Sequence, residues 1–181
     1  GSVILSDYET GETLSVLDGG YLTKIRTGAI SGVATKYLSR EDASALCVIG
    51  AGEQAEGLIA AVLAVRKINT IHFASRTTEK AERLAKQTKD LYDVNVEVFE
   101  DANQAIEGTD IVVTATNSST PVFDRTLDPG VHLNAVGSFK PDMQELPTES
   151  MMVANKIVVE STEAAMEETG DLKIYLEIVN Y

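Results

Sequence analysis

The sequence predicts an α/β protein: a doubly wound, mostly parallel Rossmann sheet, preceded by a β-hairpin and a helix from a second domain. Three observations lead to this prediction. From residue 46 onward, short runs rich in β-branched residues alternate with helical patterns, which is typical of βαβ units. The first run ends in Gly50-Ala51-Gly52, a turn suited to a pyrophosphate. The first 45 residues do not follow this alternation.

The N-terminal segment predicts a β-hairpin followed by one long helix. Short apolar runs at residues 3–5 and 13–16 flank Glu9-Thr10-Gly11-Glu12, whose residues favour a turn. The range 21–38 has a helical composition, although two glycines within it weaken the helix propensity. Because an isolated hairpin is marginally stable in water, we expect this segment to pack against a second domain or a partner subunit.

The remaining elements alternate along the chain. We expect strands at residues 46–49, 70–74, 95–99, 110–115 and 131–136, with residues 156–159 as a candidate for a further one. We expect helices at residues 54–66, 78–92, 102–107 and 162–168. The second of these helices is amphipathic, because Leu84 and Leu91 share one face while Lys80, Glu82 and Lys86 lie on another.

Composition limits the classes of partner. Of the 181 residues, 44% are hydrophobic and 24% are charged, which is typical of a folded globular protein. A net charge of -13 repels phosphate backbones, so we expect no nucleic-acid partner. No apolar run approaches the ~20 residues of a membrane-spanning helix, and a single cysteine forms no internal disulfide. We therefore expect a cytoplasmic protein without a membrane partner.

The turn after the first Rossmann strand has the composition that a dinucleotide pyrophosphate requires. Gly50 permits a tight turn, Gly52 lets the pyrophosphate approach the backbone, and Ala55 allows close packing of helix on strand. The helix N-terminus adds free N–H groups and about half a positive charge. We expect the cofactor to contact Gly50, Ala51, Gly52, Glu53 and Gln54. Glu53 should point outward, since its charge would repel the pyrophosphate; a tight turn without a ligand is the alternative.

The end of the second strand favours NADP(H) over NAD(H). Versions that prefer NAD usually carry an acid here, ~20 residues beyond the glycines, to bind the ribose 2′-hydroxyl. This chain instead has Ser75, Arg76 and Thr77, a cation between two hydroxyls, which suits a 2′-phosphate. NAD(H) is the alternative cofactor. The alternative interpretation of Arg76 is a solvated arginine at the sheet edge.

Five motifs follow one another along the chain. They are Asp18-Gly19-Gly20, Arg26-Thr27-Gly28-Ala29, Gly50-Ala51-Gly52-Glu53-Gln54-Ala55, Asp110-Ile111-Val112-Val113-Thr114-Ala115-Thr116 and Asn134-Ala135-Val136-Gly137. Together with Glu145-Leu146, in this order, they resemble the ornithine cyclodeaminase/mu-crystallin family over essentially the whole chain.

The resemblance implies a Rossmann domain inserted into a substrate and dimerisation domain that both chain ends form. Full-length members are longer and are expected to be homodimers. We therefore expect residues 1–45 to be a fragment of the second domain with its linking helix. Residues 46–160 would form the NAD(P)-binding Rossmann domain, and residues 161–181 the return segment towards the second domain.

The resemblance also assigns roles to single residues. Arg26 matches the arginine that holds the substrate carboxylate, and a guanidinium is suited to bidentate carboxylate binding. The other matched positions are expected near the cofactor: Thr27, Thr114, Ala115, Thr116, Val136 and Gly137. True cyclodeaminases carry an aspartate two residues beyond the last of these. Here Phe139 stands there, and a phenyl ring can neither accept a proton nor orient an amine.

These residues predict an NAD(P)-dependent oxidoreductase acting on a small amino acid or its imine, of the ketimine reductase or amino-acid dehydrogenase type. Two alternatives stay open: deaminating cyclisation of the ornithine cyclodeaminase type with bound NAD, and a non-catalytic NADP-binding protein like mu-crystallin. The proton donor is expected outside this chain, so the chain alone should be inactive. No metal site is expected, because His72 and His132 lack a second ligand at metal spacing, and Cys47 is interpreted as a core residue.

Overall fold

The chain forms two sheets, and the computed structural model describes residues 1–179. An antiparallel hairpin comes first, made of β1 (Ser2–Ser6) and β2 (Thr13–Asp18). The second sheet contains β3 (Ala45–Ile49), β4 (Thr70–Ala74), β5 (Asn95–Phe99), β6 (Ile111–Thr114) and β7 (His132–Ala135). Its five strands are all parallel, in the order β5-β4-β3-β6-β7. This is the predicted doubly wound order, with β3 at its centre.

Seven helices connect and follow these strands within the described part of the chain. They are α1 (Gly19–Leu38), α2 (Ala55–Val65), α3 (Thr78–Leu91), α4 (Ala102–Ile106), α5 (Thr148–Met152), α6 (Thr162–Glu168) and α7 (Gly170–Ile178). The sequence did not predict α5 or α7. Across residues 1–179, no helix is both long enough and apolar enough to cross a membrane.

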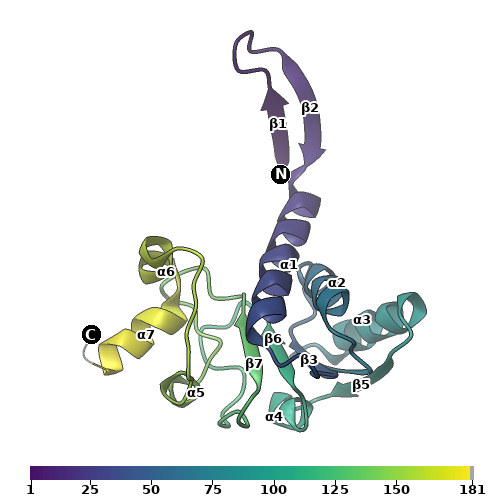
Figure 1. The fold of residues 1–181 in the computed structure, drawn as a ribbon, viewed down its shortest axis with the longest axis vertical. Helices are drawn as coiled ribbons and strands as arrows, with labels where there is room; N and C mark the ends of the chain where they lie inside the picture. The colour runs from purple at the N-terminus through teal and green to yellow at the C-terminus, as the bar shows by residue number, and fades with distance from the viewer. Residues whose placement is uncertain (180–181) are drawn as a thin grey trace.

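Helices cover both faces of the parallel sheet, as Figure 1 shows. Along β3 the side chains alternate between two apolar clusters. Leu46 and Val48 belong to the cluster that includes α2 and α3. Cys47 and Ile49 belong to the cluster that includes residues of α4, α5 and α7. Burial on both faces explains why the central strands are continuously apolar rather than alternating in polarity.

Two local predictions were wrong. Residues 156–159 do not form a strand, and Ile157 and Val158 are exposed, so this apolar run neither pairs with the sheet nor enters its core. Leu91 is 76% exposed, although it shares a helix face with the buried Leu84. The reason is that α3 ends at Leu91, and the turn into β5 leaves this side chain outside the core.

The hairpin and the start of α1 project from the rest of the molecule (Figure 1). Asp7 closes the hairpin by accepting bonds from the N–H groups of Glu9 and Thr10, and Asp18 caps the start of α1. Large apolar side chains are exposed on both strands: Val3, Ile4, Leu5, Leu14, Val16 and Leu17. The predicted hairpin is confirmed, and its apolar surface has no cover within the described residues.

The remainder of α1 packs closely on α2. A Cβ atom at Gly28 would collide with the backbone of Gly57, and one at Gly57 would lie 2.6 Å from the carbonyl oxygen of Lys24. Lys24 Nζ also lies 2.7 Å from Glu56 Oε2. The glycine that weakens helix propensity is therefore needed for the contact between the two helices.

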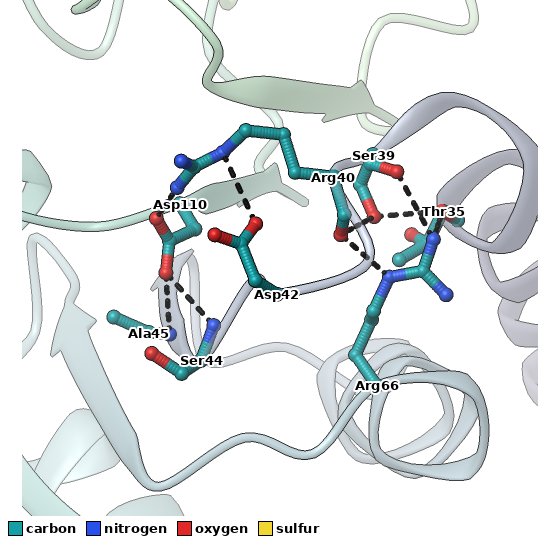
Figure 2. A network of polar contacts seen from close by, with 8 residues as sticks. All are labelled: Thr35, Ser39, Arg40, Asp42, Ser44, Ala45, Arg66 and Asp110. Atoms are coloured by element: carbon teal, nitrogen blue, oxygen red, sulfur yellow. Dashed lines mark hydrogen bonds and ion pairs between the residues drawn. The ribbon is translucent and has the colours of Figure 1, made fainter.

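A polar network fixes the linker between α1 and β3 (Figure 2). Asp110, just before β6, accepts the backbone N–H groups of Ser44 and Ala45 at 2.8 and 3.0 Å and also pairs with Arg40. The guanidinium of Arg66 donates to backbone carbonyls at the end of α1, including that of Arg40 at 2.8 Å. The end of α1 and the starts of β3 and β6 are thus held together at the amino edge of the sheet.

Candidate cofactor and substrate site

Strand register brings the predicted cofactor segments to one edge of the sheet. Ile49 of β3 is level with Ala74 of β4 and Thr114 of β6, and Thr114 is level with Ala135 of β7. The residues that follow these positions leave the sheet together at its carboxyl edge. In an open parallel sheet this is the edge where ligands bind, beside the strand at which the order reverses. We call this edge of the sheet the carboxyl edge.

The turn after β3 has a backbone that only glycine suits. Gly50 has a φ of 108°, and its N–H donates to the carbonyl of Ala74 at 2.8 Å. A Cβ atom at Gly50 would collide with the carbonyl of Ala115 and lie 3.0 Å from Thr116 Cγ2. Gly50 is therefore required by the chain's own packing, and it joins the turn to the end of β6.

Gly52 differs from Gly50, because a Cβ atom there would meet nothing within 4 Å. The helix α2 begins just beyond, with Ala55 fully buried, and the Gln54 side chain makes no capping bond. Gln54 Oε1 is buried without a hydrogen-bond partner, and Glu53 is exposed. An uncapped helix start, open space at a glycine and an unpaired polar atom together fit a dinucleotide pyrophosphate at this turn.

The segment after β4 offers a cation at the same edge. Ser75 Oγ accepts the N–H of Thr77 at 3.3 Å, and Thr77 begins α3 without a side-chain cap. Arg76 is exposed, and none of the ion pairs within residues 1–179 includes it. Its guanidinium is free to bind a phosphate beside the helix start.

The sequence did not predict the role of Glu145, whose carboxylate is fully buried at the ends of β6 and β7. Its Oε1 accepts the N–H and the hydroxyl of Thr116 at 2.6 and 2.7 Å. Its Oε2 accepts the hydroxyl of Thr114 at 2.8 Å and the N–H of Gly137 at 2.7 Å. Burial raises the pKa of Glu145, and these four bonds oppose that shift.

Glu145 in turn is held by a second buried acid, Asp171 of α7. Asp171 Oδ1 accepts the backbone N–H groups of Glu145 and Leu146, each at 2.9 Å. Asp171 Oδ2 is buried without a hydrogen-bond partner, and burial raises the pKa of this carboxyl group. The sequence marks Glu145 only as part of the Glu145-Leu146 motif and gives no sign of these contacts, because the partners of both acids lie far along the chain.

The structure places the other predicted site residues in different surroundings. Thr114 is fully buried with its hydroxyl bound to Glu145, whereas Ala115, Thr116 and Val136 are partly accessible. Gly137 is buried, and a Cβ atom there would collide with Thr116 and Glu145. Thr114 and Gly137 therefore support the carboxyl edge as buried residues and are not exposed to a ligand.

The expected substrate arginine lies on α1, level with the start of α2. Gly28 faces α2, because it contacts Gly57. Arg26 is two residues earlier, about 200° around the helix, and so lies on nearly the opposite side of α1 from α2. Arg26 is exposed, and Thr27 is partly buried. Phe139, which follows β7, is 57% exposed with Lys140 Nζ 5.7 Å from its ring centroid. Arg26 and Phe139 both remain accessible to a ligand.

The histidines and the cysteine have structural surroundings. His72 Nδ1 lies 2.7 Å from the carbonyl of Ala105. His132 Nε2 lies 3.2 Å from Asn134 Oδ1, and burial lowers the His132 pKa. Cys47 is buried, which raises its pKa to about 12. Within residues 1–179, no group of three or more histidine, cysteine, aspartate or glutamate residues could hold a metal ion.

Comparison with known proteins identifies relatives over nearly the whole chain. The model of the ornithine cyclodeaminase/mu-crystallin family matches residues 1–179. A delta(1)-pyrroline-2-carboxylate reductase of Bacillus cereus is 56% identical over 96% of this chain and 54% of its own length. Ketimine reductase mu-crystallin of Rattus norvegicus is 36% identical over 94% of this chain and 53% of its own length. The chain thus spans about half the length of these curated relatives.

Solved structures share the fold over the same extent. Delta(1)-pyrroline-2-carboxylate reductase of Thermococcus litoralis, in complex with NADH and L-proline, has a TM-score of 0.93 and 34% identity. The match covers 99% of this chain and 56% of that one. An archaeal alanine dehydrogenase dimer with bound NAD has a TM-score of 0.88 and 32% identity, covering 98% of this chain and 54% of that one.

Proposed function

Because this chain belongs to the ornithine cyclodeaminase/mu-crystallin family, we propose that its protein is an NAD(P)-dependent oxidoreductase of carbon–nitrogen bonds. The substrate class is a small cyclic imino acid such as Δ1-pyrroline-2-carboxylate, or the corresponding amino acid. The observation that carries the proposal is the carboxyl edge, where the uncapped start of α2 lies beside open space at Gly52. The names of the relatives and the L-proline bound in one neighbour support the substrate class.

The chain's own residues would bind and orient the reactants. Backbone N–H groups of the Gly50-Ala51-Gly52 turn would hold the pyrophosphate of the dinucleotide. A reduced dinucleotide bound there would supply a hydride to the carbon of the imine, and the imine nitrogen would take up a proton. Arg26 would hold the substrate carboxylate and so fix the neighbouring carbon for the transfer. The ends of β6 and β7 would face the nicotinamide half.

Reduction is favoured over deaminating cyclisation by Phe139. An exposed phenyl ring stands where a cyclodeaminase of this family carries an aspartate. Ring closure of a diamino acid needs a group that orients or deprotonates the amine, and Phe139 supplies neither. The deaminating reaction predicts ammonia release without net cofactor oxidation, so an assay for ammonia separates the two reactions.

The preferred cofactor is proposed to be NADP(H). Exposed Arg76, between Ser75 and Thr77 at the end of β4, suits a 2′-phosphate. The neighbours that bind NADH and NAD support the coarser assignment to NAD(P)(H), and the preference for NADP(H) rests on Arg76.

The division into domains and the assembly of the whole protein are also proposals. We propose that residues 1–45 and 161–181 belong to the substrate and dimerisation domain, and that residues 46–160 form the cofactor domain. Support comes from the exposed apolar side chains of both hairpin strands, and from the archaeal alanine dehydrogenase dimer. A homodimer that covers the hairpin would bury this surface.

Titration of the 181-residue chain with NADPH and with NADH, followed by nicotinamide fluorescence, tests the cofactor assignment. Tighter binding of NADPH is expected. Equal or tighter binding of NADH would retain the fold and reject the NADP preference. The full-length protein should then oxidise the reduced cofactor in the presence of Δ1-pyrroline-2-carboxylate. If it transfers hydride to no imino acid and from no amino acid tested, the proposed activity is wrong.

A further inference from the structure

We infer that Glu145 is a positioning residue that sets the spacing of the β6 and β7 ends for the nicotinamide half of the cofactor. This inference rests on the proposed function, because it concerns the use of the same carboxyl edge. Glu145 itself is fully buried, so it acts through the strand ends that it binds.

Glu145 replaces backbone pairing at the point where the sheet ends. The last pair of the β6–β7 ladder is Thr114 with Ala135, followed by one bond from Val136 N–H to the Thr114 carbonyl at 2.9 Å. Beyond that point, the carboxylate joins the N–H of Thr116 to the N–H of Gly137, one through each oxygen. One carboxylate therefore joins the two strand ends, at the point where Gly137 closely approaches the Thr116 carbonyl.

The four partners specify a carboxylate rather than an amide. Two of them are backbone N–H groups, on Thr116 and Gly137, which can only donate. A glutamine at position 145 would place its NH2 group against one of these N–H groups in either orientation. One donor would then lose its acceptor, and the two strand ends would move apart.

Helix α7 holds Glu145 in this position. Asp171 of α7 holds the N–H groups of Glu145 and Leu146. The position of the carboxylate therefore depends on the C-terminal helix as well as on the sheet. Gly137 completes the fit, because any side chain there would occupy the space of the Glu145 carboxyl group.

The position of Glu145 predicts an effect on one half of the cofactor. Adenosine would bind beyond β3, at the end of β4, and β3 separates β4 from β6. With strands ~4.8 Å apart, the Ser75 segment lies about 10 Å from the end of β6 and about 14 Å from the end of β7. Sites this far apart are expected to behave nearly independently, because they share only the packing around Gly50.

Calorimetric titration of three forms of the 181-residue chain tests the inference: wild type, Glu145→Gln and Asp110→Asn. The probes are the preferred reduced dinucleotide and, for the adenosine half alone, ADP and 2′,5′-ADP. In Glu145→Gln we expect the dinucleotide Kd to rise about tenfold, as for one lost charge-assisted hydrogen bond. The Kd values of ADP and 2′,5′-ADP should stay within about twofold.

Asp110→Asn is the matched control. Asp110 also joins strand ends through a carboxylate, but at the amino edge of the sheet, away from the site. It should leave all the Kd values within about twofold. Thr114→Val is a milder second variant, because it removes a single bond to Glu145 from a fully buried side chain. It should weaken the dinucleotide several-fold without affecting ADP.

The other outcomes reject either the positioning role of Glu145 or the proposed cofactor function. An unchanged dinucleotide Kd in Glu145→Gln would reject the positioning role. Equal weakening of dinucleotide and ADP, or the same pattern in Asp110→Asn, would show general loosening of the fold and reject the role as well. If Glu145→Gln does not fold, an unchanged dinucleotide Kd in Thr114→Val rejects the role. If wild type binds neither dinucleotide nor ADP, the proposed cofactor function fails, and this inference fails with it.

Discussion

At the scale of single residues, the two glycines of the cofactor turn serve different purposes. Gly50 has a positive φ and abuts the end of β6, whereas a side chain at Gly52 would meet only open space. The first glycine is therefore needed for folding, and the second is free to serve a ligand. Their substitutions should separate stability from cofactor binding.

We predict that Gly52→Val changes the free energy of unfolding by no more than about 0.5 kcal/mol, as is usual for exposed positions. Its side chain would occupy the space proposed for the pyrophosphate, so dinucleotide affinity should fall at least about tenfold. Gly50→Ala should instead cost about 1–3 kcal/mol of stability, because it forces a strained backbone and a collision. Urea unfolding and cofactor titration of both variants check this. Unimpaired cofactor binding by Gly52→Val would contradict the proposed site.

A second residue-scale prediction concerns Arg76. If it binds a 2′-phosphate, Arg76→Ala should weaken NADPH by roughly 10- to 100-fold, the range for hydrogen bonds to a charged group, and leave NADH unchanged. Arg83→Ala is the control, because Arg83 is an exposed arginine of α3 beyond its first turn. Parallel fluorescence titrations measure the effect. Equal loss for both cofactors would mean that Arg76 does not distinguish them.

The site was only partly predictable at this scale. Local patterns identify Gly50-Ala51-Gly52 and Ser75-Arg76-Thr77, because a turn between strand and helix is encoded by neighbouring residues. Glu145 escaped prediction because its partners Thr114 and Thr116 lie 31 and 29 residues away. Asp171 lies 26 residues from the backbone that it holds. Such contacts exist only once the sheet and α7 have assembled.

At the scale of elements, sequence patterns located most helices and strands. The predicted strands at residues 46–49, 70–74 and 110–115 all exist, because continuous apolar runs mark strands buried on both faces. Residues 156–159 have a similar composition but no neighbouring strand. Helices α5 and α7 were missed, since packing against the sheet stabilises short helices more than their own propensity does.

The contact between α1 and α2 gives a prediction at the same scale. In Gly57→Ala, the new Cβ atom would lie 2.6 Å from the Lys24 carbonyl, so the helices must move apart. We expect a loss of about 1–3 kcal/mol in the free energy of unfolding, as for other overpacked sites. Ala64→Ser, on the exposed face of α2, is the control and should be nearly neutral. Equal stability of Gly57→Ala and wild type would show that the contact tolerates a methyl group.

At the scale of the whole molecule, buried and paired acids make stability depend on pH in opposite directions. Asp110 is partly buried, which by itself raises its pKa. The N–H groups of Ser44 and Ala45, together with Arg40, outweigh this effect, and its pKa is lowered overall. Burial raises the pKa values of Glu145 and Asp171 despite their hydrogen bonds. Asp110 favours the folded state when charged, and Asp171 disfavours it when charged.

The directions of these pKa shifts determine how the free energy of unfolding changes with pH in variants of Asp110 and Asp171. The stability that Asp110 contributes is present above its unfolded pKa of about 3.9 and is lost as pH falls through the lower folded value. Asp110→Asn should therefore be less stable than wild type at pH 7 and approach it at acidic pH. For Asp171 the folded state binds its proton more tightly than the unfolded state. Its contribution is therefore present below about pH 3.9 and lost as pH rises through the raised folded value.

Asp171→Asn removes that loss, so its stability relative to wild type should improve from pH 4 to pH 7, whereas that of Asp110→Asn should decline. Urea unfolding of wild type, Asp171→Asn and Asp110→Asn at pH 4 and pH 7 measures the free energy of unfolding of each variant relative to wild type. Both variants lose one acidic group, so comparing their two pH dependences cancels the effect of the changed net charge. If the Asp171→Asn difference is independent of pH, the carboxyl group does not titrate between folded and unfolded states. If it falls as pH rises, Asp171 favours the folded state when charged, and its unpaired Oδ2 must gain a partner in solution.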